Sequence, residues 1–147
     1  RHIEWPIVIM LAAMIPIGQA LESTGITALI ATEVVSLAGD LHIFWLLMII
    51  LIITMLITDV INNAATAVIM APFSVNIALQ LGQPLEPFLM VVAVGASCAF
   101  LTPIGHQCNT LVMGPGNYKF SDYWRLGLPL DILIVLASIP MILFVWL

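Results

Sequence analysis

The sequence contains very little charge. Charged residues make up 7% of its 147 residues, and the basic side chains are Arg1, Lys119 and Arg125. Three bases spread over the chain cannot form the positive surface that nucleic-acid phosphates require, so we expect no nucleic-acid partner. Cysteine is also scarce: Cys98 and Cys108 lie in apolar sequence, without a CxxC motif or a histidine at ligand spacing. We predict that both are buried small residues.

Apolar residues, in contrast, are abundant. The chain is 63% hydrophobic and has a mean hydropathy of +1.20, whereas soluble domains are about 45 to 50% apolar. This composition predicts an all-α, polytopic membrane protein. Its first residue is Arg1, and no charged, apolar and cleavage-site regions of a signal peptide follow. We expect the C-terminal piece of a longer protein.

Run lengths predict where the chain crosses a bilayer, because a spanning helix needs about 20 apolar residues. Residues Trp5–Leu21 are uncharged and predict a first span. Residues Ile26–Leu37 are too few to cross and carry Glu33, so we expect a connecting helix. Residues Leu126–Leu147 predict a last span, with Asp131 near its start. Glu33 and Asp131 are both expected at the membrane–water interface.

The first interruption of an apolar run follows Ile43–Ile57. The polar stretch Asp59–Asn63 comes next, and Ala64–Leu81 then resumes a helical composition. Asp59 is the only charged residue between Asp40 and Glu86. An unpaired polar group in hydrocarbon costs about 2 to 7 kcal/mol, so this break must bind something or be covered by protein. The pattern predicts either a re-entrant helical hairpin or one interrupted span.

A second interruption follows Pro87–Leu101, which is again short for a span. Its polar sequence begins at Thr102, and we predict that Thr102–Asn117 is not helical because it contains five glycines and prolines. Short, interrupted apolar segments are the best sequence indication of the binding site of a secondary transporter.

The chemistry of a broken helix indicates possible ligands. Freed carbonyls suit Na⁺, and freed amides suit an anion. Thr58 and Asn62 are four residues apart and would share a face if the helix continued. Asn63 heads the next helix and could cap it or donate to a carboxylate or sulfate. Because neither break contains Lys or Arg, an anion's charge would be met by helix N-termini and bound cations, which favours coupling to Na⁺.

Simpler interpretations remain open at each of these positions. Asn62 and Asn63 could be plain helix caps, and Asp59 could be an N-cap or a hydrogen-bonded group within the bundle. His106 is expected to be a loop residue satisfied by backbone rather than a metal ligand. An enzyme would have to use Asp59, His106 or Cys108, and no hydrolase motif surrounds them. A channel would need a filter motif that is missing. We therefore predict no enzyme.

Two stretches resemble a known family. TDVINNAATAVIMAP at residues 58–72 and FLTPIGHQCNTLVMGPGNYKFSDYWRLGLPL at residues 100–130 resemble the C-terminal half of divalent anion:sodium symporters. That family lies within a wider group containing citrate and arsenite carriers, and the chain is most similar to bacterial permeases with TrkA-C-type regulatory domains. The resemblance implies one inverted repeat of an elevator-type transporter, with a re-entrant hairpin and a broken transmembrane helix.

The resemblance also implies roles for particular residues. The family's Ser-Asn-Thr triplet matches Asn62-Asn63-Ala64, so Asn63 would contact substrate while Thr58 and the backbone of residues 62–64 would bind Na⁺. Leu101 would offer a carbonyl to Na⁺, and Thr102, followed by Pro103, would face the substrate. Ala64 lacks the hydroxyl of the family pattern, which leaves sulfate as plausible as a dicarboxylate.

The resemblance finally implies an architecture. Residues 1–42 would be a scaffold-type span and connecting helix, 43–82 the hairpin, 83–120 the broken helix and polar loop, and 121–147 the last helix. An inverted N-terminal repeat would complete the site, and the protein would form a homodimer in the plasma (inner) membrane, crossing it several times. The expected function is Na⁺-coupled symport of a small divalent anion, such as sulfate or a di- or tricarboxylate. The alternative is a Na⁺/H⁺ antiporter or arsenite-type carrier that uses Asp59.

Overall fold

The computed structural model describes residues 12, 16, 20, 23–38 and 42–147, and in these ranges the regular structure is entirely helical. The expected all-α class is confirmed at this level. The predicted span Trp5–Leu21 falls almost wholly outside the described residues and stays a prediction. The described helices are α2 (Ile26–Ala38), α3 (Ile43–Thr58), α4 (Asn63–Gln80), α5 (Leu85–Ala96), α6 (Gln107–Met113) and α7 (Phe120–Trp146).

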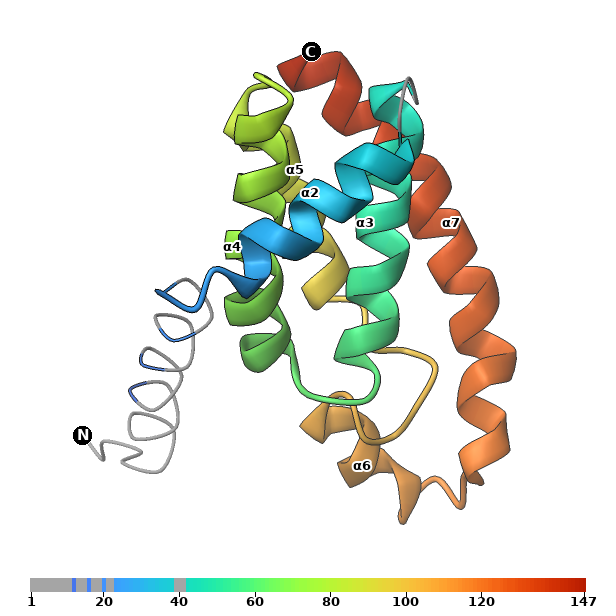
Figure 1. Ribbon diagram of the computed structural model, residues 1–147. Coiled ribbons are helices and arrows are strands. Elements are labelled where there is room, and N and C mark those ends of the chain that lie inside the picture. The colour runs from blue at the N-terminus through green and yellow to red at the C-terminus, as the bar shows by residue number, and fades with distance from the viewer. Residues whose placement is uncertain (1–11, 13–15, 17–19, 21–22, 39–41) are drawn as a thin grey trace, which may run out of the picture.

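Four helices form a bundle whose members run roughly alongside one another. Figure 1 shows α3, α4, α5 and α7 in this bundle, with α2 crossing over it and α6 at one end. Helix α5 packs against α3, α4 and α7, and α2 packs against α4. The segment that follows α5 begins between these neighbours, with Cys98 and Ala99 buried, whereas Ile104 further along is exposed.

The core is formed mainly where α5 meets α3 and α4. Leu47 and Leu51 of α3, Ile77 of α4, and Phe88 and Val91 of α5 are fully buried. Burying one such side chain stabilises a fold by about 1.5 to 3 kcal/mol. These contacts therefore hold the ends of three helices in fixed positions relative to one another.

The α3 and α5 backbones approach most closely near the second half of each helix. A Cβ atom added to Gly95 would lie 2.8 Å from Cβ of Thr54 and 3.2 Å from the Leu51 carbonyl oxygen. Glycine is required here because it alone lets the two helices meet at this distance. The crossing fixes the end of α5 beside the end of α3.

Helix length distinguishes α7 from the others. Its 27 residues make it the one helix in the described part of the chain that is long and apolar enough to cross a membrane, whereas α3 and α5 are shorter apolar helices. At about 1.5 Å per residue, α3 reaches about 24 Å and α5 about 18 Å, against a hydrocarbon core of about 30 Å. Both helices therefore end partway along α7.

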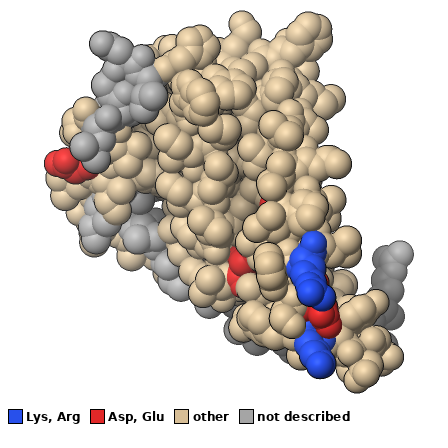
Figure 2. All heavy atoms as spheres, turned by 90° about the vertical axis from the view of Figure 1, so that its right-hand side faces the viewer, with Lys and Arg blue, Asp and Glu red and all other residues tan. Residues whose placement is uncertain are grey.

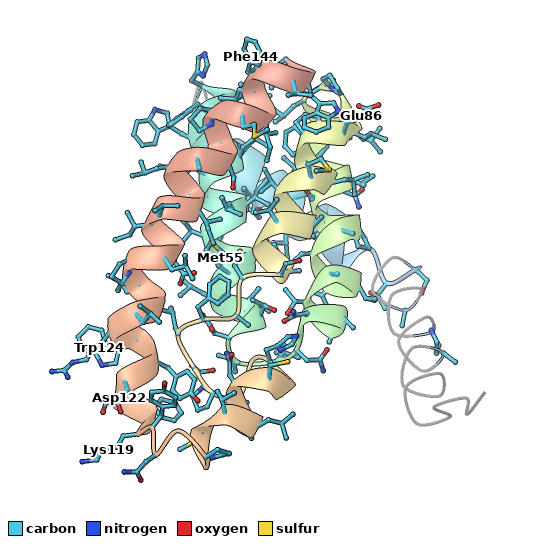
Figure 3. The ribbon with its side chains drawn as sticks, turned by 180° about the vertical axis from the view of Figure 1, so that it is seen from behind. Met55, Glu86, Lys119, Asp122, Trp124 and Phe144 are labelled. Carbon is cyan, nitrogen blue, oxygen red and sulfur yellow. The ribbon has the colours of Figure 1, made fainter. Side chains whose placement is uncertain are left out.

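Charged side chains are few on the faces that the figures show, and some acidic atoms lie between the two ends of the bundle (Figure 2). In Figure 2 the surface is mostly uncharged, with Lys and Arg gathered toward one end. In Figure 3 Lys119, Asp122 and Trp124 mark that end, and Glu86 and Phe144 mark the other. The long wall between them carries exposed large apolar side chains of α7, including Leu126, Leu133, Leu136 and Phe144. Such a wall is typical of contact with lipid or another apolar surface.

Three sequence predictions are wrong. The segment Thr102–Asn117 does contain a helix, α6, because its glycines and prolines lie outside Gln107–Met113. Helix α7 begins at Phe120 rather than Leu126, which places Asp131 well inside it instead of near its start. Cys108 is exposed, whereas Cys98 is buried as expected, since Cys108 lies on the first turn of the short α6 at the end of the bundle.

Candidate functional site

The first break separates α3 from α4. Helix α3 ends at Thr58, Asp59 is its C-cap, and α4 begins at Asn63. The Asn62 side chain accepts a hydrogen bond of 2.8 Å from the Ala65 amide. The helix-cap interpretation of Asn62 is therefore confirmed, as is the prediction that Asn63 heads the next helix. Because the chain turns after Thr58, Asn62 does not continue its helical face.

Thr58 connects the two sides of this break instead. Its hydroxyl lies 2.9 Å from Oδ1 of Asn63 and 3.0 Å from the Ala96 carbonyl oxygen, and the residue is fully buried. Since a hydroxyl has one proton, only one of these oxygens accepts it at a time. The arrangement brings three oxygen atoms together at the junction of α3, α4 and α5.

The second break runs from the end of α5 to the start of α6. The Asn109 side-chain amide donates to the carbonyls of Ala99 (2.7 Å) and Thr102 (3.1 Å). The Thr110 hydroxyl donates to the Pro103 carbonyl at 2.5 Å. Irregular backbone inside a membrane protein must find such partners, because lipid offers none. Side chains of α6 therefore satisfy the loop that precedes it.

Sequence reasoning missed these supporting residues. Asn109 also accepts a hydrogen bond at its carbonyl, 2.6 Å from the Tyr123 hydroxyl of α7. The signal available was that Asn109 and Thr110 come a few residues after Pro103 and Gly105 of the break. Such a signal does not reveal which carbonyls the side chains will reach.

Asp59 joins the two breaks. Its Oδ1 accepts a hydrogen bond of 3.0 Å from the Leu101 amide, and its carbonyl accepts one of 2.6 Å from the Thr102 hydroxyl. The residue is 3% exposed. Gly105 lies against the same corner, where an added Cβ would be 2.7 Å from the Thr58 carbonyl oxygen. Asp59 is thus a hydrogen-bonded group of the bundle, as one of its simpler interpretations predicted, but it is the C-cap of α3 and not an N-cap.

Three buried side-chain oxygens lack a hydrogen-bond partner within the part of the chain that the structure describes. They are Oδ2 of Asp59, Oγ1 of Thr66 and Oδ1 of Asp131. Asp131 lines a cavity of about 290 Å³ between α3 and α7, together with Leu101 and Met55. An unpaired buried polar atom costs about 1 to 3 kcal/mol, more if it is charged. These atoms mark the places where a ligand or further protein could contribute.

The predicted substrate contacts lie around this junction with differing exposure. Asn63, Ala64 and Thr102 are half-buried, and Pro103 is buried. The Thr102 hydroxyl, besides donating to Asp59, accepts from the amides of Ile104 (3.2 Å) and Gly105 (3.3 Å). Their roles in binding stay predictions, as do those of Thr58, Asn62 and Leu101.

His106 and the basic residues lie away from a metal or anion site. The His106 side chain accepts a hydrogen bond of 3.2 Å from the Cys108 amide, which confirms that backbone satisfies it. No three His, Cys, Asp or Glu side chains gather at a metal-binding distance among the described residues. The described bases, Lys119 and Arg125, lie at the start of α7 (Figure 2). The junction therefore offers neutral oxygens, amides and Asp59.

Comparison with known proteins identifies relatives of the whole chain. A family model described as citrate transporter matches residues 1–147. An uncharacterized transporter of Synechocystis is 38% identical over 98% of the chain, and the uncharacterized transporter YfbS of Escherichia coli is 39% identical over 97%. Sodium/sulfate cotransporter 2 of Chlamydomonas reinhardtii is 28% identical over 94%. The chain spans 24%, 23% and 16% of the lengths of these three relatives.

Proposed function

Because the chain belongs to the citrate transporter family, we propose that it forms part of a sodium-coupled secondary transporter of a small divalent anion, such as sulfate or a di- or tricarboxylate. Three relatives, two named as sodium/sulfate cotransporters and one as a probable sodium/sulfate cotransporter, support this proposal at 27 to 30% identity. Na⁺ is a cotransported substrate in this proposal rather than a resident cofactor.

The observation that carries the proposal is the direct contact between two helix breaks. Asp59 of the first break accepts hydrogen bonds from Leu101 and Thr102 of the second break, which lie 42 and 43 positions later in the chain. In Figures 1 and 3 both breaks lie between the two ends of α7. Irregular backbone at such a depth is tolerated where it is buried in protein or lines a cavity. Paired breaks of this kind are where secondary transporters bind substrate and ion.

The atoms at the first break suit Na⁺. Thr58 Oγ1 and Asn63 Oδ1 are uncharged oxygens 2.9 Å apart, and the Ala96 carbonyl lies 3.0 Å from the same hydroxyl. Hard cations prefer such oxygen ligands. We assign the Na⁺ to Thr58, Asn62, Asn63 and the backbone of Ala64, with Leu101 adding a carbonyl from the second break. Na⁺ bound there would replace the hydrogen bonds that the Thr58 hydroxyl donates.

The anion would bind next to this cation. The first amides of a helix have no intrahelical partner and carry a partial positive charge, so the start of α4 at Asn63 suits a carboxylate or sulfate. Asn63 and Ala64 are half-buried there, and Thr102 and Pro103 lie on the second break. The described bases lie elsewhere, so bound Na⁺ would supply much of the compensating charge. Anion binding should then depend on Na⁺.

Ala64 bears on which anion is carried. Its methyl group cannot donate a hydrogen bond, so the site has one hydroxyl fewer than the family pattern offers to a carboxylate. Sulfate and a dicarboxylate both remain within the proposal. A direct competition between the two anions distinguishes them.

The proposal includes an architecture for the whole protein. A second, inverted repeat would supply the partner half of the site, and most of Phe44–Gly114 would move as an elevator-type transport domain. Residues 1–42 would form scaffold and connection and would contribute to a homodimer in the inner membrane. The proposal is supported by the length of the relatives, about four times that of the chain.

Transport by the full-length protein tests the function. The protein is reconstituted in proteoliposomes, and uptake of labelled sulfate and of labelled citrate is measured with an inward Na⁺ gradient and with K⁺ replacing Na⁺. Na⁺-dependent accumulation of either anion is expected. Accumulation that is equal with K⁺ would rule out the coupling.

A matched pair of asparagines on α4 tests the site. Asn63→Ala removes an oxygen beside Thr58 and should lower Na⁺-dependent uptake at least tenfold. Asn76→Ala is the control, because the Asn76 amide bonds within its own helix, to the Pro72 carbonyl at 2.8 Å. It should retain uptake within about twofold. Equal losses in both variants would remove Asn63 from the site.

A Na⁺/H⁺ antiporter or arsenite-type carrier is the second candidate. One observation favours it: Oδ2 of Asp59 is buried and has no hydrogen-bond partner in the described part of the chain, and intramembrane acids commonly serve ion transport. This candidate requires the acid itself. Normal transport by an Asp59→Asn variant would exclude it.

A further inference from the structure

We infer that Asp59 is a positioning residue that links the two breaks, so that occupancy of the Na⁺ site beside Thr58 sets the position of Thr102, the proposed substrate contact on the second break. This inference rests on the proposed function. It assigns the linkage to the oxygens of Asp59 as hydrogen-bond acceptors and not to the charge of the carboxylate.

The contacts of Asp59 reach both sides of the junction. Its backbone amide closes the end of α3 by donating to the Met55 carbonyl at 3.2 Å. Its side chain and its carbonyl then hold two successive residues of the second break, Leu101 at 3.0 Å and Thr102 at 2.6 Å. The same residue therefore belongs to the rigid end of one helix and to the start of the other break.

The positions of these partners explain why a shift would be transmitted. Thr58, a proposed Na⁺ ligand, directly precedes Asp59, and Thr102, a proposed substrate contact, is held by the Asp59 carbonyl. Gly105 closes the corner from the other side, with its added Cβ 3.0 Å from Cα of Asp59. The loop therefore packs closely against the end of α3. On this inference, a movement of Thr58 on binding Na⁺ is transmitted to Thr102 through these contacts.

The two carboxylate oxygens of Asp59 allow its role as a hydrogen-bond acceptor to be tested separately from its charge. Oδ1 accepts a hydrogen bond from the Leu101 amide, whereas Oδ2 is buried and has no hydrogen-bond partner among the residues that the structure describes. An asparagine would keep an oxygen that accepts from the Leu101 amide, and its side-chain NH₂ group would take the place of Oδ2. An alanine would leave the Leu101 amide without its acceptor. Asp59→Asn should therefore preserve the linkage and Asp59→Ala should break it.

The test compares these variants in the full-length protein in proteoliposomes. KM for sulfate or citrate, whichever the wild type carries, is measured at limiting and at saturating Na⁺, and the value at limiting Na⁺ divided by the value at saturating Na⁺ measures the linkage. Asp59→Ala should lower this ratio at least fivefold. Asp59→Asn should stay within twofold of wild type. Asp122→Ala is the matched control, since Asp122 also accepts from a backbone amide, that of Lys119 at 2.8 Å, but at the exposed start of α7.

A second measurement does not depend on transport. Hydrogen–deuterium exchange over residues 97–105 of the full-length protein should be at least tenfold faster at the Leu101 amide in Asp59→Ala, and unchanged in Asp59→Asn and Asp122→Ala. If Asp59→Ala fails to fold, the pair Thr102→Val and Thr102→Ser tests the other hydrogen bond. Valine should lower the KM ratio and serine should keep it.

The outcomes separate this inference from the function on which it rests. A wild type that accumulates neither anion with Na⁺ overturns the function, and the exchange measurement still tests the contact. An unchanged KM ratio or unchanged exchange in Asp59→Ala overturns the linkage. Equal losses in Asp59→Asn and Asp59→Ala would assign the role to the charge and overturn it as well.

Discussion

Replacing Gly105 by alanine is the most direct test of how closely the two breaks fit. The added Cβ would lie 2.7 Å from the Thr58 carbonyl oxygen, 2.8 Å from Cβ of Ala99 and 3.0 Å from Cα of Asp59. None of these atoms is the end of a flexible side chain. The loop must therefore move away from the end of α3.

The size of the effect follows from these contacts. Inserting a methyl group into a packed interior costs about 1 to 3 kcal/mol, and losing the Leu101 to Asp59 hydrogen bond adds about 1 kcal/mol. The total of about 2 to 4 kcal/mol corresponds to more than a tenfold change in an equilibrium constant, since about 1.4 kcal/mol is tenfold. We expect the half-saturating Na⁺ concentration for anion uptake to rise at least tenfold.

Two other glycines serve as controls in the same assay. Gly114 ends α6 with φ −66°, and an added Cβ there meets nothing within 4 Å, so Gly114→Ala should leave stability and uptake unchanged. Gly95→Ala would press on Thr54 inside the helical core at 2.8 Å, so it should lower the melting temperature without a selective change in Na⁺ dependence. If Gly105→Ala were as harmless as Gly114→Ala, the close fit of the breaks would be refuted.

Three further predictions follow from single hydrogen bonds. Thr58→Val removes the hydroxyl that lies 2.9 Å from Asn63 and 3.0 Å from Ala96, and it should weaken Na⁺ activation of uptake at least tenfold, whereas Thr58→Ser should retain it. Asn109→Ala leaves the Ala99 and Thr102 carbonyls without their donor, which should cost about 1 to 3 kcal/mol and appear as a lower melting temperature of the full-length protein. Tyr123→Phe loses only the bond to the Asn109 carbonyl, so its melting temperature should fall less, in keeping with about 1 kcal/mol; a larger fall than in Asn109→Ala would contradict the assigned order.

The helices of the first break could be predicted because sequence and local structure agree there. An apolar run stops at Thr58, and Asn62 follows as a residue type that commonly caps a helix. The structure places the start of α4 at Asn63, one residue from the predicted start of the apolar run. Local rules also explain the Asn62 side chain, whose partner is three residues away.

The second break was harder to predict because its structure depends on distant partners. Leu101 and Thr102 bond to Asp59, more than 40 residues earlier, and no local pattern specifies that distance. Counting glycines and prolines over the whole segment hid α6, since it occupies the seven residues that contain none of them. Asp131 was misplaced for a different reason: α7 begins at Phe120, six residues before the apolar run from Leu126 that was used to place the helix.

Each of the two breaks depends on the other for hydrogen-bond partners. The first break leaves the Asp59 oxygens at the end of α3, and the second supplies the Leu101 amide and the Thr102 hydroxyl that satisfy them. Either segment alone would expose unpaired polar groups at a depth where neighbouring lipid could not pair them. A straight helix would need neither. The chain therefore accepts two interrupted helices together, and the structural reason for retaining them is the set of uncharged oxygens and amides that only their junction provides. A rearrangement that separates the breaks would leave these groups without their hydrogen-bond partners. The hairpin of α3 and α4 and the second break should therefore move as one body.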